Sequence, residues 1–164
     1  MNINIFSKIE ENVINGNYID NIAITQIISL KKTETISYKG LLELSKKASI
    51  ALLELGIKRN NKIFINGKSS INFISIFLGA LKIGIIPIPG NPELSPQQTN
   101  HILNNSKPAL IISDKKIKNI NLNFNHKQLN NKQWKKLIYE VRLKSINTYK
   151  SKINDIAFLI YSSG

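Results

Sequence analysis

The chain has 164 residues and no cysteine, and 23 Lys and Arg residues against 10 Asp and Glu residues give it a formal net charge of +13. This length fits one domain with a sizeable core, and the lack of cysteine excludes disulfides, thiolate catalysis and zinc–thiolate sites. No basic segment followed by an apolar core opens the chain, and Lys82 interrupts the longest apolar stretch, 71–89, before it is long enough to span a bilayer. We therefore expect a soluble, cytoplasmic protein with no membrane span.

The first part of the chain predicts a helix, a hairpin and then a longer helix. Residues 5–15 have the apolar spacing of an amphipathic helix. The apolar segments 22–30 and 33–38 are separated only by lysines, which is typical of a hairpin. From Ser37, a candidate N-cap, apolar residues recur at helical spacing until Gly56, which stands where a helix C-cap is expected.

Strands and helices then alternate along the chain. Short apolar segments predict strands at 62–66, 85–88 and 109–113. Helical spacing predicts helices between them, at 71–81 and 96–103. This alternation indicates the α/β class, with a mainly parallel sheet, flanking helices and right-handed crossovers.

Two later regions depart from the regular pattern. The segment 87–92 contains three prolines, and because proline has no N–H to donate, we expect a structured loop that leaves the sheet. Beyond Asp114 the pattern is poorer and resembles an insertion around one helix at 128–144. Trp134 and Tyr139 lie on the apolar stripe of that helix, so we expect both to pack in the core rather than to stack on bases.

Few side chains suit catalysis. His101 and His126 have no second histidine or clustered carboxylate nearby, so we expect surface or partly packed histidines. The isolated Asp114 and Asp155 are interpreted as surface charges, because the sequence shows no acid and base that pair. We assign no catalytic residue and no metal ligand.

The last nine residues carry the one candidate binding site. Residues 156–160 are continuously apolar, which predicts a strand buried on both faces. After it, Ser162 and Ser163 offer hydroxyls and Gly164 allows the backbone to approach a ligand closely, so consecutive amides could point at one anion. An ordinary polar turn explains the same residues, and the meaning of the turn depends on what precedes it.

What precedes it resembles a known family, the AMP-forming acyl-CoA synthetases and adenylation domains. The two most specific motifs are Phe-Leu-Gly-Ala-Leu-Lys at 77–82 and Asp-Ile-Ala-Phe-Leu-Ile-Tyr-Ser-Ser-Gly at 155–164. The resemblance covers about residues 20–164 and is nearest to fatty acyl and aryl (benzoate-like) CoA ligases. It implies the N-terminal subdomain of the large domain of an adenylate-forming enzyme, with 1–20 as a helical lead-in and 21–164 as the first part of the adenylation domain. Weaker motifs keep the family's order: Ser37-Tyr38, Gly56-Ile57, residues 87–92 and residues 102–114.

The resemblance also implies a reaction. In the family, the ending continues into a Thr- and Gly-rich loop that holds the β and γ phosphates of ATP, and Ser162, Ser163 and Gly164 match its first positions. The implied enzyme joins a carboxylate to AMP and passes the acyl group to coenzyme A, using ATP and Mg²⁺. The family's other site residues have no counterpart here, so we expect this chain to be a truncated and inactive fragment. The missing C-terminal portion would cover an exposed sheet edge.

Two alternatives stay open. A short protein with this fold could act as a non-catalytic binding or partner module that a separate chain completes. The net charge could also indicate a basic polyanion-binding domain. Nearly all cations are Lys, with Arg only at 59 and 142, whereas base recognition favours Arg, so we expect a compositionally biased surface and no nucleic-acid partner.

Overall fold

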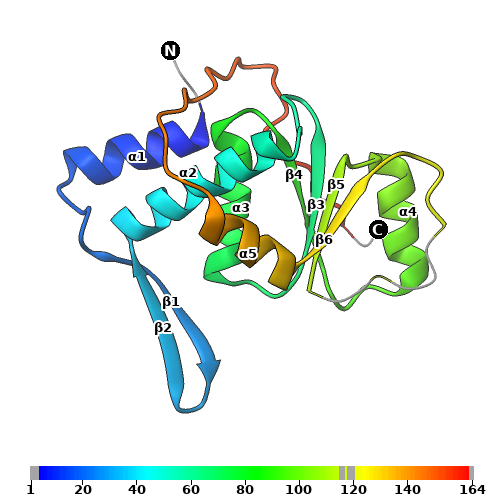
Figure 1. The fold of residues 1–164 in the computed structure, drawn as a ribbon, viewed down its shortest axis with the longest axis horizontal. Helices are drawn as coiled ribbons and strands as arrows, with labels where there is room; N and C mark the ends of the chain where they lie inside the picture. The colour runs from blue at the N-terminus through cyan, green and yellow to red at the C-terminus, as the bar shows by residue number, and fades with distance from the viewer. Residues whose placement is uncertain (1–3, 115–116, 118–120, 163–164) are drawn as a thin grey trace.

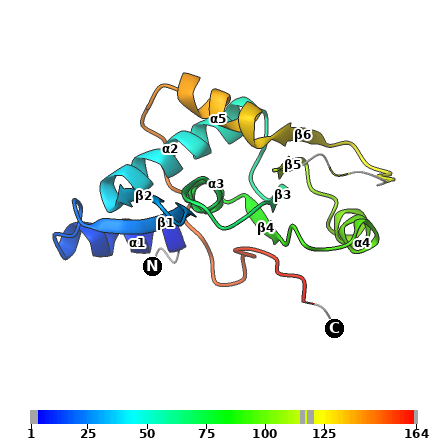
Figure 2. The same cartoon turned by 90° about the horizontal axis from the view of Figure 1, so that it is seen from below.

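Four parallel strands form the centre of the molecule, and helices lie on both of their faces (Figures 1 and 2). The computed structural model describes residues 4–114, 117 and 121–162. The predicted α/β class with a mainly parallel sheet is confirmed. The strand order is β4 (Ile86–Gly90), β3 (Lys62–Asn66), β5 (Leu110–Ser113) and β6 (Lys127–Asn130). The helices are α1 (Ile5–Asn15), α2 (Tyr38–Glu54), α3 (Ile71–Lys82), α4 (Pro96–Ser106) and α5 (Asn131–Glu140).

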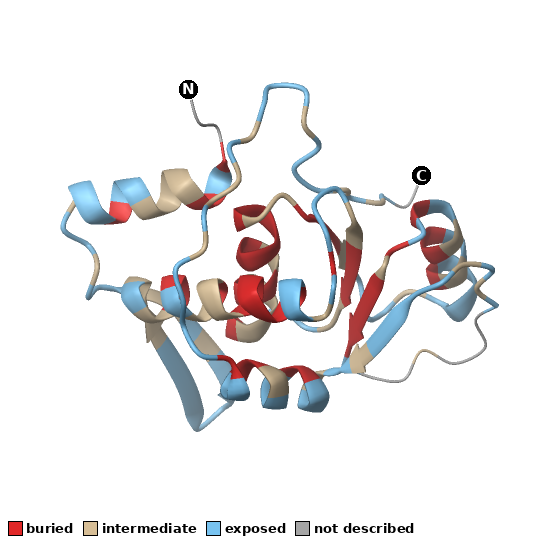
Figure 3. Cartoon of the chain, turned by 45° about the horizontal axis from the view of Figure 1, so that its top comes forward, coloured by how far each residue is buried: buried red, intermediate tan, exposed pale blue. Residues whose placement is uncertain are grey.

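Each face of the sheet buries a different set of side chains, because successive residues of a strand point to opposite faces. One set packs against α2, α3 and α5, and the other packs against α4 (Figure 3). This two-sided burial explains why the three central residues of β3 and the first three of β5 are all apolar. The first set includes Ile63, Ile65, Leu110 and Ile112, and the second includes Phe64, Ile88 and Ile111.

Helices α2 and α3 approach each other closely at Gly79, within the Phe-Leu-Gly-Ala-Leu-Lys motif. A Cβ atom on Gly79 would lie 2.6 Å from the backbone oxygen of Ser45, so a larger residue would push the helices apart. The Ser49 hydroxyl donates to the carbonyl of Gly79 at 2.8 Å. The glycine therefore sets the distance between these two helices.

The predicted N-terminal elements are also confirmed. Strands β1 (Ile22–Ser29) and β2 (Lys32–Ser37) pair antiparallel in a two-stranded sheet of their own. Ser37 caps α2 by accepting a hydrogen bond from the amide of Gly40, and Gly56 follows the helix with φ of +76°. Helix α1 is capped by Asn4, whose side-chain amide also donates to the carbonyl of Leu81 at 2.7 Å and so joins α1 to α3.

The predicted loop at 87–92 is wrong in its first part, because Pro87 and Pro89 lie within β4. The strand is at the edge of the sheet in the described part of the chain, and the amide of Ile86 donates toward β3, to the carbonyl of Asn61 at 2.9 Å. Since successive amides alternate in direction, the two proline nitrogens face away from β3. A missing N–H therefore removes no bond between β3 and β4.

The predicted helix at 128–144 is wrong at both ends. Residues 127–130 form β6, which pairs parallel to β5, and the helix α5 ends at Glu140. Asn130 ends the strand and caps the helix at once, in a reciprocal capping box with Gln133. Trp134 is fully buried as expected, but Tyr139 is 87% exposed, so its predicted core position is wrong.

Candidate functional site

The segment 156–162, which leads to the predicted anion-binding turn, lies along the outer edge of β4. Its first residue, Ile156, lines a small cavity together with Gly84, just before the strand. Further along, the amide of Leu159 donates to the carbonyl of Pro87 at 3.1 Å. These two contacts show that the segment runs in the same direction as β4.

The predicted buried strand at 156–160 is nevertheless wrong. In a parallel ladder, the carbonyl of Leu159 would accept a second bond from the amide of the residue at 89, but Pro89 has none to give. One bond alone does not continue a sheet. The burial differs as well, since Ile156 is 58% exposed and Ile160 is 69% exposed.

Side chains hold this segment to both faces of the sheet instead. The ring of Phe158 lies 5.6 Å from the ring of Phe77 on α3. Leu159 and Tyr161 pack on the opposite face, with the apolar cluster beneath α4. The Tyr161 hydroxyl donates to the side-chain oxygen of Asn105 at 2.7 Å. The residues that precede the turn are therefore fixed from two sides.

The start of the segment is fixed by a polar cluster around Asp155. One of its carboxylate oxygens accepts from the Tyr149 hydroxyl at 2.5 Å and from the amide of Lys152 at 2.8 Å. The Arg59 guanidinium lies 4.2 Å above the centre of the Tyr149 ring. The interpretation of Asp155 as an isolated charge is therefore wrong.

These bonds also change the titration of both groups. The hydrogen bond from the Lys152 amide, together with that from Tyr149, holds the pKa of Asp155 below its usual value. The hydrogen bond to Asp155 is the main reason that the pKa of Tyr149 is raised. At neutral pH, an ionised Asp155 therefore accepts from a protonated Tyr149.

Ser162 is exposed and follows directly after the fixed Tyr161. Ser163 and Gly164, the other two predicted phosphate-binding residues, lie outside the described residues. The anion-binding turn therefore stays a prediction.

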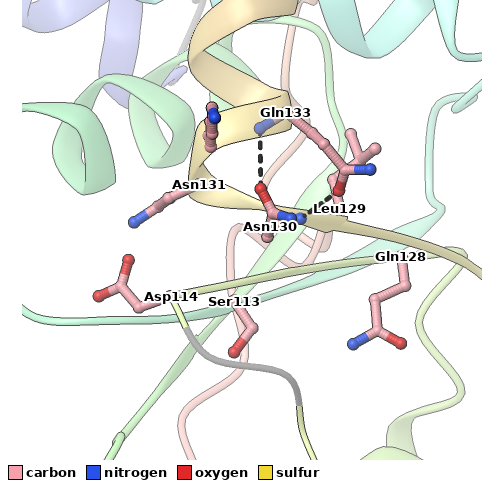
Figure 4. A pocket seen from close by; sticks show the side chains of 8 residues that line it. Ser113, Asp114, Gln128, Leu129, Asn130, Asn131 and Gln133 are labelled. Carbon is pink, nitrogen blue, oxygen red and sulfur yellow. Dashed lines mark hydrogen bonds between the residues drawn. The ribbon is translucent and has the colours of Figure 1, made fainter.

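A second group of polar side chains gathers where β5 and β6 end and α5 begins, around a cavity of about 470 Å³ (Figure 4). Asp114 accepts from the amide of Lys68 at 3.1 Å, which ties the end of β5 to the end of β3. Asn131 accepts from the side-chain amide of Asn72 at 3.2 Å, which ties α5 to α3. Asp114 is exposed, as expected of a surface charge, and it also has this structural hydrogen bond.

The sequence analysis missed this group, although its pattern was available. Polar residues follow the apolar part of three strands, as Asn66, Ser113-Asp114 and Asn130-Asn131. The carboxyl ends of parallel strands meet at one edge, which is where α/β proteins most often bind ligands. The strand β6 was not predicted, so the third member of the group could not be placed there.

Comparison with known proteins extends the resemblance. The sequence profile of the family described as AMP-binding enzyme matches residues 11–164. The chain belongs to this family. The resemblance to adenylate-forming CoA ligases is thereby confirmed, and the fold is that of the N-terminal subdomain of these enzymes.

Two relatives of this chain are named as CoA ligases. The 4-hydroxybenzoate–CoA/benzoate–CoA ligase of Rhodopseudomonas palustris is 25% identical over 54% of this chain and 16% of its own length. The 4-coumarate–CoA ligase-like 9 of Arabidopsis thaliana is 22% identical over 87% of this chain and 27% of its own length. The chain therefore spans about a quarter or less of these relatives.

The solved structures agree on the fold of this chain. The anthranilate CoA ligase AuaEII, in complex with anthranoyl-AMP, superposes with a TM-score of 0.82. It is 19% identical, and the match covers 99% of this chain and 32% of that one. Nearly the whole of this chain thus has a counterpart in a larger enzyme.

The remaining candidate residues of the chain, His101 and His126, do not form a site with other titratable side chains in the described part of the chain. His101 and His126 are both exposed, and no group of three or more His, Cys, Asp and Glu residues in the described part of the chain could hold a metal ion. Among the same residues, no helix is long and apolar enough to cross a membrane.

Proposed function

We propose that this chain is the N-terminal part of an ATP-dependent ligase that activates a carboxylic acid and transfers the acyl group to coenzyme A. In the first step, a carboxylate oxygen of the substrate attacks the α phosphorus of ATP, and pyrophosphate leaves. In the second step, the thiol sulfur of coenzyme A attacks the acyl carbon, AMP leaves and the thiol proton is released. The acid is proposed to be aromatic or fatty, since CoA ligases for such acids are among the relatives.

One observation carries the assignment of the phosphate site. Residues 155–161 are anchored at Asp155, bonded to β4 through Leu159 and held on both faces of the sheet, and the exposed hydroxyl of Ser162 comes next. A loop that begins from a fixed segment can present its groups without reorganisation, which is what stabilising a departing pyrophosphate requires. We propose that Ser162, Ser163 and Gly164 form the start of this loop.

The described residues fit ATP only in part. Ser162 is small, polar and exposed, as a phosphate contact needs to be. Mg²⁺ would offset the phosphate charge when bound. The described residues include no group of three or more His, Cys, Asp and Glu residues that could hold a metal ion, and we name no Mg²⁺ ligand among them. We also propose that residues 1–164 are inactive alone and that the protein works in the cytoplasm.

The test begins with the reading frame beyond the codon for Gly164, which we expect to encode a Thr- and Gly-rich turn with Pro-Lys-Gly. The protein translated from the complete frame should exchange labelled pyrophosphate into ATP when benzoate or a fatty acid is supplied. Residues 1–164 alone should give no such exchange. A frame without the turn would contradict the ligase assignment, and exchange by residues 1–164 would contradict the proposed inactivity.

The role of the serines is tested in the protein that shows exchange. Removing a transition-state donor typically lowers the rate by about 10²-fold, so we expect a loss of that order in the double variant S162A/S163A. Ser69→Ala, which changes another exposed serine, is the matched control. Equal exchange rates in both variants would remove the two serines from the phosphate site.

A further inference from the structure

The hairpin β1–β2 projects from the body of the molecule (Figures 1 and 3). Among the described residues, its two strands pair only with each other. Near the base it is held in place: Ile24 and Ile36 pack on the apolar cluster beneath α1 and α2, and the side-chain oxygen of Gln26 accepts from the amide of Ile71 at 3.0 Å. These contacts fix the direction of the hairpin. Gln26 lies three residues before the end of β1, so these contacts hold the lower part of the hairpin.

The tip carries large apolar side chains in water. Ile27 is 76% exposed, Ile28 is 47% exposed, and Leu30 at the turn is fully exposed. A cluster of exposed aliphatic side chains at the end of a projecting element is unfavourable in water unless a partner covers it. The feature therefore points to an apolar environment beyond the tip.

Positive charge surrounds these apolar side chains. Lys31 and Lys32 follow Leu30 directly and are exposed. The one acidic residue of the two strands, Glu34, lies opposite Gln26 in the middle of the hairpin, one pair further from the turn than Ile27. The tip thus places exposed aliphatic side chains next to the ammonium groups of Lys31 and Lys32, on a protein whose net charge is +13.

We propose that the hairpin tip docks the protein on an anionic membrane surface. The aliphatic side chains of Ile27, Ile28 and Leu30 would enter the boundary between headgroups and acyl chains, while Lys31 and Lys32 would bind lipid phosphates and carboxylates. The positive charge of the whole protein adds attraction at longer range, and salt weakens it. This proposal does not depend on the ligase function.

A second copy of the chain fits the tip less well. Two tips brought together would place their lysines side by side, and lysines on an edge strand oppose pairing between molecules. A soluble polyanion would satisfy the lysines but would leave Leu30 in water. Of these three candidates, an anionic bilayer provides both an apolar phase and negative charge.

Binding to vesicles tests the proposal directly. The chain should sediment with vesicles of phosphatidylcholine and phosphatidylserine, and at least tenfold more weakly with phosphatidylcholine alone. The double variants I27S/L30S and K31A/K32A should each lose at least tenfold in binding to the mixed vesicles. The matched controls are Tyr139→Ser, which removes an exposed apolar side chain from α5, and K135A/K136A, which removes two adjacent exposed lysines.

Poly-glutamate separates insertion from simple charge attraction. I27S/L30S should bind this polymer as the unchanged chain does, because the polymer has no apolar phase. Equal vesicle binding by hairpin variants and controls would overturn the proposal, as would the absence of binding by the unchanged chain. Self-association that I27S/L30S abolishes, without vesicle binding, would assign the tip to a second copy instead. Far-UV circular dichroism shows that each variant is folded.

Discussion

The four-stranded sheet and residues 141–162 are stabilised by different kinds of interaction. Strands β3, β4 and β5 are held by apolar side chains that alternate between two covered faces, so many contacts support each of them. Residues 141–162 contain no helix or strand where the structure describes them. They are held by single hydrogen bonds, such as those from Tyr149 to Asp155 and from Leu159 to Pro87, and by separate apolar side chains that pack on the two clusters of the sheet.

This difference predicts how each region responds to substitution. Loss of one core side chain should weaken the whole cooperative unit, because the contacts in a packed core support one another. Loss of one bond in residues 141–162 should loosen that segment alone, since proteins also open locally.

The largest effect is expected for Phe64→Ala. Phe64 is fully buried on the face covered by α4, and truncating such a phenylalanine lowers the free energy of unfolding by about 3–5 kcal/mol. Tyr139→Ala, in which an 87% exposed ring is lost, should change it by less than about 0.5 kcal/mol. Urea titration followed by circular dichroism measures both. Similar midpoints for the two variants would contradict the proposed role of the sheet core.

A local effect is expected for Asp155→Ala. Loss of the carboxylate removes the acceptor for Tyr149 and Lys152, so amide hydrogen exchange should speed up over 149–161 while β3 and β5 stay protected. Asp20→Ala, which removes an exposed carboxylate before the hairpin, is the control. Faster exchange throughout the sheet would show that the segment and the sheet open together.

The same carboxylate should make the segment sensitive to acid. The pKa of Asp155 is lower in the folded chain, so its contribution is present above the pKa of the unfolded chain and is lost as pH falls through the folded value. Protection over 149–161 should therefore persist at neutral pH and decline below the usual range for aspartate. In Asp155→Ala this decline should be absent, and a decline of equal size would assign it to another group.

The smallest effect on stability is expected for Pro89→Val. This variant tests whether the missing amide at 89 is what keeps residues 156–160 from joining the sheet. The new amide would face the carbonyl of Leu159 and supply the missing bond of the parallel ladder. One such bond contributes about 0.5–1.5 kcal/mol, and the loss of proline's rigidity offsets about 0.4–1 kcal/mol of it. The urea midpoint should barely move.

Nuclear magnetic resonance measures the effect at the residue itself. The amide introduced at 89 should exchange slowly, whereas the amide introduced by Pro92→Val, in the exposed loop after β4, should exchange rapidly. Fast exchange at both positions would mean that the prolines do not limit pairing along this edge.

Regular elements were predictable where the side-chain pattern alone decides them. The predicted bounds of β3 are those observed, because Ile63, Phe64 and Ile65 are buried on both faces as their apolar run indicates. The start of α2 at Ser37 was also predictable, since capping depends on neighbouring residues only.

The errors fall where position in the sheet decides the outcome. Lys127–Asn130 has one apolar residue, and only its place beside β5 makes it a strand. Pro87 and Pro89 are tolerated because their nitrogens face outward, which the sequence does not show. The apolar run at 156–160 does not form a strand because Pro89, on the outer edge of β4, has no amide to donate to the carbonyl of Leu159. The bond from Tyr149 to Asp155 depends on tertiary geometry and has no counterpart in any periodic pattern.

The place of the four strands along the chain has a consequence for the order of assembly. All of them lie between Lys62 and Asn130, so the sheet can form during synthesis while residues 141–162 are still inside the ribosome. Those residues then dock on a sheet edge that has already formed. Their contact residues Pro87, Phe77 and Asn105 are in place by then. The segment that leads to the proposed phosphate loop therefore docks last, on a sheet edge that has already formed.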